Sequence, residues 1–122
     1  MKVTIDRSKW LRGEGEDKSY LLRATDGKMC CLGFLGLACG LTEDEIRDCD
    51  TPLDTRKYYK FPAGLLRQTE DGVWVNSIFS GLLMGFNDSE EYSEEEREAE
   101  LTQLFKLIGI ELEFTDGGSI DR

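Results

Sequence analysis

Residues 27–40 read GKMCCLGFLGLACG and place three of the four cysteines of the chain between glycines. The stretch from residue 29 to residue 41 has no polar face, so a helix formed there must be enclosed by the rest of the domain. The spacing of Gly33, Gly36 and Gly40 puts these residues along one stripe, where another backbone can approach closely. We therefore expect this segment to be the buried central helix of the fold.

The two ends of the chain have the pattern of short strands. Residues 1–5 (MKVTI) and 110–114 (IELEF) alternate polar and apolar side chains, with Val3 and Ile5 on one face and Glu111 and Glu113 turned to solvent. We expect these strands to pair with each other, antiparallel, and Asp6 to cap a helical turn after the first strand.

Two capping boxes mark the beginnings of helices. Thr42 with Glu45 predicts a short helix, and Ser93 with Glu96 predicts a longer one whose apolar residues recur at helical spacing up to Ile108. A further helix is predicted over residues 77–86, capped by Asn76. We expect five of its apolar side chains to face the core: Ile78, Phe79, Leu82, Leu83 and Phe86.

These elements predict an α+β fold. The chain would form a mostly helical single domain over residues 1–122, in which a small antiparallel sheet pairs the N- and C-terminal strands around the central Cys/Gly-rich helix. We expect a polar loop near residues 13–19, an irregular connection over residues 50–62, and a loosely ordered tail from about residue 116.

Charge is concentrated in one segment of the chain. The net charge is −10, and residues 88–100 (DSEEYSEEEREAE) contain eight acids and one arginine. Because such a chain repels phosphates, we expect no direct binding of DNA or RNA. No apolar run reaches the length of a bilayer, and the N-terminus lacks the features of a signal peptide, so we expect a cytoplasmic protein that does not enter a membrane.

The cysteines lack the spacing of a metal site. Cys30, Cys31, Cys39 and Cys49 form no C-x2-C pair, and the chain has no histidine. Adjacent thiols on a helix point to different faces, so no three of them converge. We expect free, buried thiols and no metal or cofactor. The alternative is a metal or small-ligand site, with or without catalysis, formed by this cysteine segment.

Catalytic signatures are missing as well. Without histidine there is no Ser-His-Asp triad and no histidine-based zinc hydrolase site. The glycine-bearing loops match neither a dinucleotide nor a P-loop fingerprint. We therefore expect no enzyme.

The acidic segment has two interpretations. Acids stabilise the beginning of a helix and keep a small protein in solution. A helix that begins at Ser93 would also present Glu94, Glu95 and Glu98 as an exposed row, with Tyr92 beside it. Such a row can imitate a nucleic acid backbone and bind a basic protein surface.

Aromatic residues elsewhere are candidate anchors for the same partner. Tyr58, Tyr59 and Trp74 belong to residue types that dominate binding energy in protein interfaces. The sequence does not show whether they lie near the acidic row.

Three pieces of the chain resemble a group of small phage and prophage proteins of unknown function. The pieces are LLRATDGKMCCLGFLGLACG (21–40), MGFNDSEEYSEEEREAELTQLF (84–105) and GIELEFTD (109–116). The position of the third cysteine and the aromatic segment after residue 50 depart from that pattern. The resemblance implies an origin rather than a mechanism, since small acidic phage proteins often bind and redirect a host protein.

We therefore expect a non-catalytic, acidic, phage-type accessory protein in the cytoplasm of a bacterial host. Its partner would be a basic surface of a host protein, for example one that handles nucleic acids or serves in defence. The alternatives are the cysteine-based ligand or metal site and a homo-oligomeric structural subunit, with a homodimer as its simplest form.

Overall fold

The structure of the chain is a computed structural model, and it describes residues 1–13 and 20–116. The loop expected near residues 13–19 and the loosely ordered tail expected from about residue 116 fall almost entirely outside these residues. Helices and strands alternate irregularly along the chain, and the α+β class is confirmed.

The first half of the chain contains β1 (Lys2–Asp6), the 3₁₀ turn Arg7–Lys9, α1 (Cys31–Ala38), α2 (Glu43–Ile46) and the 3₁₀ turns Pro52–Asp54 and Tyr58–Lys60. The second half contains the 3₁₀ turn Ala63–Leu65, β2 (Leu66–Gln68), β3 (Trp74–Asn76), α3 (Ile78–Asp88), α4 (Glu94–Leu107) and β4 (Glu111–Thr115). Among the described residues, no helix is both long and apolar enough to span a bilayer.

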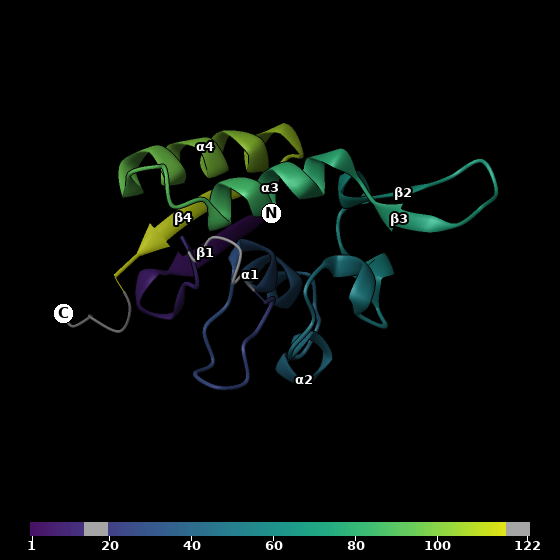
Figure 1. The fold of residues 1–122 in the computed structure, drawn as a ribbon, viewed down its shortest axis with the longest axis horizontal. Coiled ribbons are helices and arrows are strands. Elements are labelled where there is room, and N and C mark those ends of the chain that lie inside the picture. The colour runs from purple at the N-terminus through teal and green to yellow at the C-terminus, as the bar shows by residue number, and fades with distance from the viewer. Residues whose placement is uncertain (14–19, 117–122) are drawn as a thin grey trace.

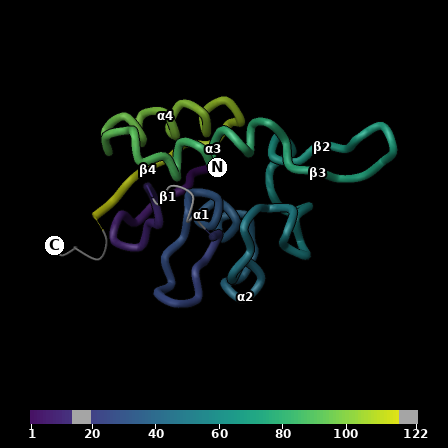
Figure 2. Tube along the Cα trace, viewed as in Figure 1, coloured from purple at the N-terminus to yellow at the C-terminus, as the bar shows by residue number. Residues whose placement is uncertain are grey.

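The elements form a body from which one hairpin projects. Helices α3 and α4 lie side by side, α4 packs on β4, and α1 packs on β1 and α3 (Figure 1). The β2–β3 hairpin extends away from the body, on the side opposite to the end of β4 (Figure 2). The core therefore lies between α1, the β1–β4 pair and the two long helices.

The terminal strands pair as expected, but their direction was predicted wrongly. β1 and β4 are parallel, with Val3 opposite Leu112 and Ile5 opposite Phe114. The antiparallel pair in the fold is the separate β2–β3 hairpin. Alternating side chains look the same in both kinds of pairing, so the pattern does not encode direction. Direction is set here by α4, which returns the chain through Gly109 to the end of the sheet where β1 begins.

Helix α1 is shorter and less enclosed than predicted. Its residues from Cys31 to Gly36 are buried, but Ala38 is exposed and Cys39 is half-buried. The prediction that residues 29–41 are fully enclosed was therefore wrong for the last turn of the helix. An uninterrupted apolar sequence does not show where a helix leaves the core, because exposed apolar residues are common on protein surfaces.

The close backbone approach expected at the glycines is present at two of them. A Cβ atom on Gly33 would overlap the carbonyl oxygen of Leu21, and one on Gly36 would lie 3.0 Å from the ring of Phe61. Gly40 instead adopts a positive φ of 99° just after the helix. Residues 20–22 and Phe61 can therefore pack directly on the backbone of α1.

The expected inward face of α3 was wrong for two of its five residues. Leu83 is buried, and Phe79 and Phe86 are half-buried against the core. Ile78 is 81% exposed and Leu82 is 46% exposed, whereas Ser80, Leu83 and Asn87 are buried. Apolar residues surround most of this helix, so their spacing is compatible with more than one inward face. The cap was also displaced by one residue from Asn76, because the hydroxyl of the following residue, Ser77, accepts the N–H of Ser80.

A buried polar pair holds the C-terminal end of α3 in place. The side chain of Asn87 accepts the indole N–H of Trp10 at 2.8 Å and the backbone N–H of Cys31 at 3.0 Å, and it donates to the carbonyl of Leu11. Arg97, 5% exposed, donates to carbonyl oxygens at the end of α3 and in the following turn. These bonds satisfy carbonyls that a helix end leaves without partners.

Both capping boxes are confirmed. Thr42 and Glu45 exchange side-chain to backbone hydrogen bonds at the start of α2, and Ser93 and Glu96 do so at the start of α4. Asp6 caps the first 3₁₀ turn by accepting the N–H of Ser8. Capping residues act within one turn of the chain, which is why local sequence predicts them well.

Candidate functional site

A partly apolar groove with a volume of about 700 Å³ lies beside the projecting hairpin. We call it the aromatic groove. It is lined by Tyr58, Tyr59, Phe61, Pro62, Ala63, Leu66, Arg67, Gln68 and Trp74. Its walls come from two 3₁₀ turns and from both strands of the β2–β3 hairpin.

Three aromatic rings form one wall of this groove. Tyr58 lies between Tyr59 and Trp74, with ring centroids 6.4 Å apart in each pair. Tyr59 is 69% exposed and Trp74 is 42% exposed. The indole N–H of Trp74 makes no hydrogen bond to any residue that the structure describes. The rings support each other, yet they present much apolar surface and polar edges to solvent.

Local packing positions these rings. The buried Phe61 anchors the segment against the glycine stripe of α1, and Lys57 forms an ion pair of 2.7 Å with Glu45 of α2. The hairpin is fastened by the side chain of Asn76, which donates to the hydroxyl of Thr51 at 3.1 Å. The groove is thus attached to the body at both of its sides.

The acidic row expected on α4 is divided by the fold. Glu98 accepts two hydrogen bonds from the guanidinium of Arg7, at 2.7 and 2.8 Å. Glu94 accepts from Arg12 at 2.5 Å and from Arg97 at 3.3 Å. These carboxylates fasten α4 to the segment after β1. Glu95 is exposed and makes no ion pair with the described part of the chain.

The neighbours of Glu94 change the pKa of its carboxyl group. Partial burial acts to raise its pKa, but the hydrogen bonds and charges of Arg12 and Arg97 outweigh it and lower the pKa below its usual value. The carboxylate is therefore held in its charged form as the partner of two arginines. Its charge is used in ion pairs within the fold and is less available to bind an external ligand.

Tyr92 does not join the other aromatic residues. Its ring packs on Phe86, with centroids 5.0 Å apart, at the C-terminal end of α3. Trp74 and the aromatic groove lie at the opposite end of that helix. The structure therefore brings together Tyr58, Tyr59 and Trp74 and separates them from the acidic row.

The four cysteines are free thiols in two different settings. Cys30 and Cys31 are buried, whereas Cys39 and Cys49 are half-buried, so the expectation of four buried thiols was wrong for two of them. Burial raises the pKa of Cys31 well above that of a free thiol, and it also raises the pKa of Cys39 and of Cys49. All three thiols are weak nucleophiles at neutral pH. Among the described residues, no three potential metal ligands are grouped to hold an ion.

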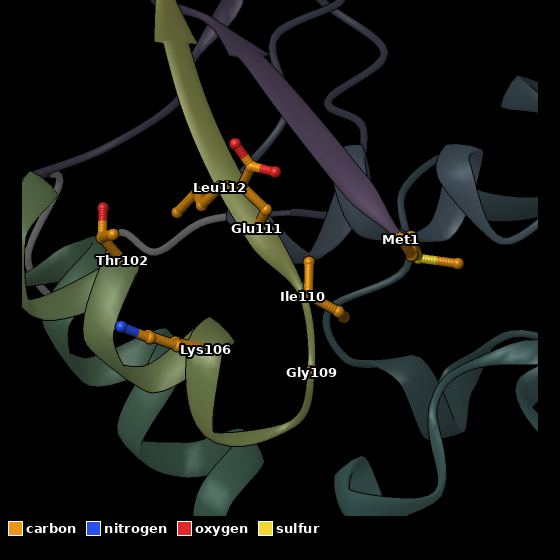
Figure 3. A pocket seen from close by; sticks show the side chains of 7 residues that line it. All are labelled: Met1, Thr102, Lys106, Gly109, Ile110, Glu111 and Leu112. Atoms are coloured by element: carbon orange, nitrogen blue, oxygen red, sulfur yellow. The ribbon is translucent and has the colours of Figure 1, made fainter.

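A second hollow, of about 600 Å³, lies where α4 meets β4 (Figure 3). Lys106 and Thr102 enter it from the helix and Glu111 enters it from the strand, while Met1 lies at its far side. The hydroxyl of Thr102 donates to a backbone carbonyl of its own helix at 2.7 Å, so it is already bonded. The charged side chains that line this hollow are one lysine and one glutamate, on a partly apolar surface.

Sequence reasoning named the three aromatic residues but not the groove. Pro62, Leu66 and Arg67 line it without any local pattern that marks them as binding residues. The available signal was compositional: residues 55–69 (TRKYYKFPAGLLRQT) contain four cations and no acid in a chain of net charge −10. Aromatic residues and arginine, both present in this segment, are enriched in protein interfaces.

Comparisons with protein-family models, with curated proteins and with solved structures gave no match.

Proposed function

We propose that this chain is a non-catalytic binding protein that docks a partner protein in the aromatic groove. One observation carries the proposal. Tyr59 and Trp74 are exposed beside Tyr58, in a groove whose lining includes further apolar residues. Exposed tryptophan and tyrosine at a hollow are typical anchors of protein interfaces.

Binding is favoured over catalysis by the chemistry of the described groups. The chain has no histidine. Burial raises the pKa of the Cys31 thiol, and Glu94 and Glu98 are engaged by arginines. Each of these groups is better suited to holding the fold together than to proton transfer or nucleophilic attack.

The acidic side of α4 supports a second contact with a basic surface. Glu95 is exposed together with Glu91 and Glu100, and no ion pair holds them to the described residues. Together with the resemblance to phage proteins, this favours an accessory protein that acts on a bacterial host protein in the cytoplasm. In that arrangement the groove supplies affinity and the acidic side supplies orientation and speed of encounter.

The test is capture of a partner from bacterial lysate by the wild-type chain and by matched variants. Trp74→Ala and Tyr59→Ala should each weaken binding about 30-fold, as expected for interface anchors. Val73→Ala is the matched control, because Val73 is an exposed apolar neighbour that does not line the groove. A partner that is captured equally by all three variants would refute the role of the groove.

Charge reversal separates the two surfaces. Glu95→Lys should reduce capture mainly at low salt, since exposed charges are screened within about 10 Å at 0.1 M ionic strength. Loss of binding in Trp74→Ala that is independent of salt would then be assigned to the groove.

A second candidate, a homo-oligomeric subunit, is favoured by the outer face of α3. Ile78 and Leu82 lie one turn apart on the same exposed face. Sedimentation of the wild type and of Ile78→Glu would test this, because a dimer closed over this face should become monomeric in the variant.

A further inference from the structure

We propose that the aromatic groove receives a short extended peptide in which an apolar or proline residue lies next to a carboxylate. This inference depends on the proposed function and adds the chemistry of the ligand to it. It is argued from the charge of the groove, from its shape and from its exposed rings.

The charged residue in the lining of the groove has the opposite sign to the net charge of the chain. Lys57 is engaged by Glu45, and Arg56 lines a separate hollow that contains carboxylates. Arg67 and Lys60 are both exposed. Among the described residues that line the groove, Arg67 is the one that carries a charge. A carboxylate of a ligand would therefore meet a guanidinium in the groove, and no acid among the lining residues described would repel it.

The shape of the groove suits an extended segment. All of β2 lines the groove, and within the described residues β2 pairs with β3 on one side only. A peptide chain can therefore lie along this strand, where extended ligands commonly bind. The faces of the rings, together with Pro62 and Leu66, provide apolar contacts for a proline or leucine side chain.

A single-stranded nucleic acid is the nearest competing ligand. Exposed aromatic rings with nearby cations also bind unstacked bases, but such sites follow the backbone with a positively charged groove. In this groove one guanidinium lines the described surface, and the chain as a whole has a charge of −10. The observations therefore favour a peptide with a single carboxylate next to its apolar anchor.

The experiment uses three matched sets of fluorescein-labelled nonapeptides, each with a leucine or proline centre. The flanking positions carry Asp and Glu, Asn and Gln, or Lys and Arg. Fluorescence anisotropy at low salt measures affinity for the full chain. We expect the acidic set to bind about tenfold more tightly than the neutral set, as one close charge pair allows.

The variants Arg67→Glu and Arg56→Glu make the decisive comparison. Both reverse one exposed charge within the same segment, but only Arg67 lines the groove. We expect Arg67→Glu to reduce affinity for the acidic peptides at least tenfold and to increase affinity for the basic peptides. The affinity of Arg56→Glu for each set should stay within about twofold of wild type. Far-UV circular dichroism and the melting temperature report that each variant is folded.

The outcomes separate this inference from the proposed function. Equal affinity for all three sets, abolished by Trp74→Ala, would overturn the acidic ligand and leave the groove as the binding site. Acidic-peptide binding that is unchanged in Trp74→Ala would overturn both. Three other outcomes would overturn the peptide inference. They are failure of every peptide set to bind, tighter binding of a twelve-residue oligothymidine, and self-association of the chain that Trp74→Ala abolishes.

Discussion

Replacing Gly33 by alanine tests whether the glycines of α1 are needed for close backbone packing. The added Cβ would overlap the carbonyl oxygen of Leu21 and lie 2.8 Å from its carbonyl carbon and 2.9 Å from Cβ of Met29. Unbonded carbon atoms prefer about 3.5–4.0 Å, so the segment containing Leu21 would have to move by about 1 Å. That segment is hydrogen-bonded, because the N–H of Leu21 donates to Cys49 at 2.8 Å.

The magnitude follows from two opposing terms. Alanine favours a helix over glycine by about 1 kcal/mol, while overpacking against a fixed backbone costs about 3 kcal/mol or more. We expect the free energy of unfolding of Gly33→Ala to fall by about 2–4 kcal/mol, a large part of the stability of a domain of this size. The melting temperature should fall by roughly 10 °C.

Gly81→Ala is the matched control within α3. It makes the same change in a helix, but no atom lies within 4 Å of the added Cβ. This variant should be more stable than wild type by about 0.5–1 kcal/mol. Urea denaturation followed by far-UV circular dichroism measures both variants. If Gly33→Ala is as stable as Gly81→Ala, close approach at the stripe is not what the helix requires.

Three further predictions concern buried polar groups and a buried thiol. Arg97→Met should cost about 3 kcal/mol, because it removes a buried guanidinium that bonds the partly buried carbonyls of Phe86, Ser89 and Tyr92. Lys2→Met, at an exposed ion pair, should cost less than about 1 kcal/mol. Asn87→Leu should likewise cost about 3 kcal/mol, since it removes the acceptor of a buried indole and of a backbone N–H; a loss below about 1 kcal/mol by urea denaturation would contradict either estimate. Burial raises the pKa of the Cys31 thiol well above its usual value, so the folded chain retains this proton when the unfolded chain releases it. Stability should therefore be complete below about pH 9 and fall at higher pH, and the fall should be smaller in Cys31→Ala; equal slopes between pH 8 and pH 10.5 would contradict this.

The elements predicted well are those whose cause lies within one or two turns of the chain. The capping boxes at Thr42 and Ser93 were predicted because each needs only a hydroxyl and a glutamate three residues later. The strands around Val3 and Leu112 were predicted because alternation is local. The buried start of α1 was predicted because a segment with no polar face has to be enclosed.

The candidate site was predicted only in fragments. Tyr58, Tyr59 and Trp74 were named by residue type. Their assembly depends on the β2–β3 hairpin, because its fold places Trp74 beside Tyr58. The use of Glu94 and Glu98 by arginines also depends on a distant segment, since Arg7 and Arg12 lie more than 80 positions away along the chain. A count of the charged residues in the sequence cannot show which acidic side chains form ion pairs within the fold.

The sequence by itself determined where α2 and α4 begin, that the two ends of the chain form strands, which helix has to be buried, and that the chain carries a strong negative charge with one reversed segment. Tertiary structure alone decided that the terminal strands run parallel, that α3 turns Ile78 outward and Asn87 inward, and that three aromatic rings meet at a groove. The physical reason is the range of the interactions. Caps and alternation are set by neighbours along the chain, whereas strand direction, helix rotation and ring contacts are set by how distant segments pack together.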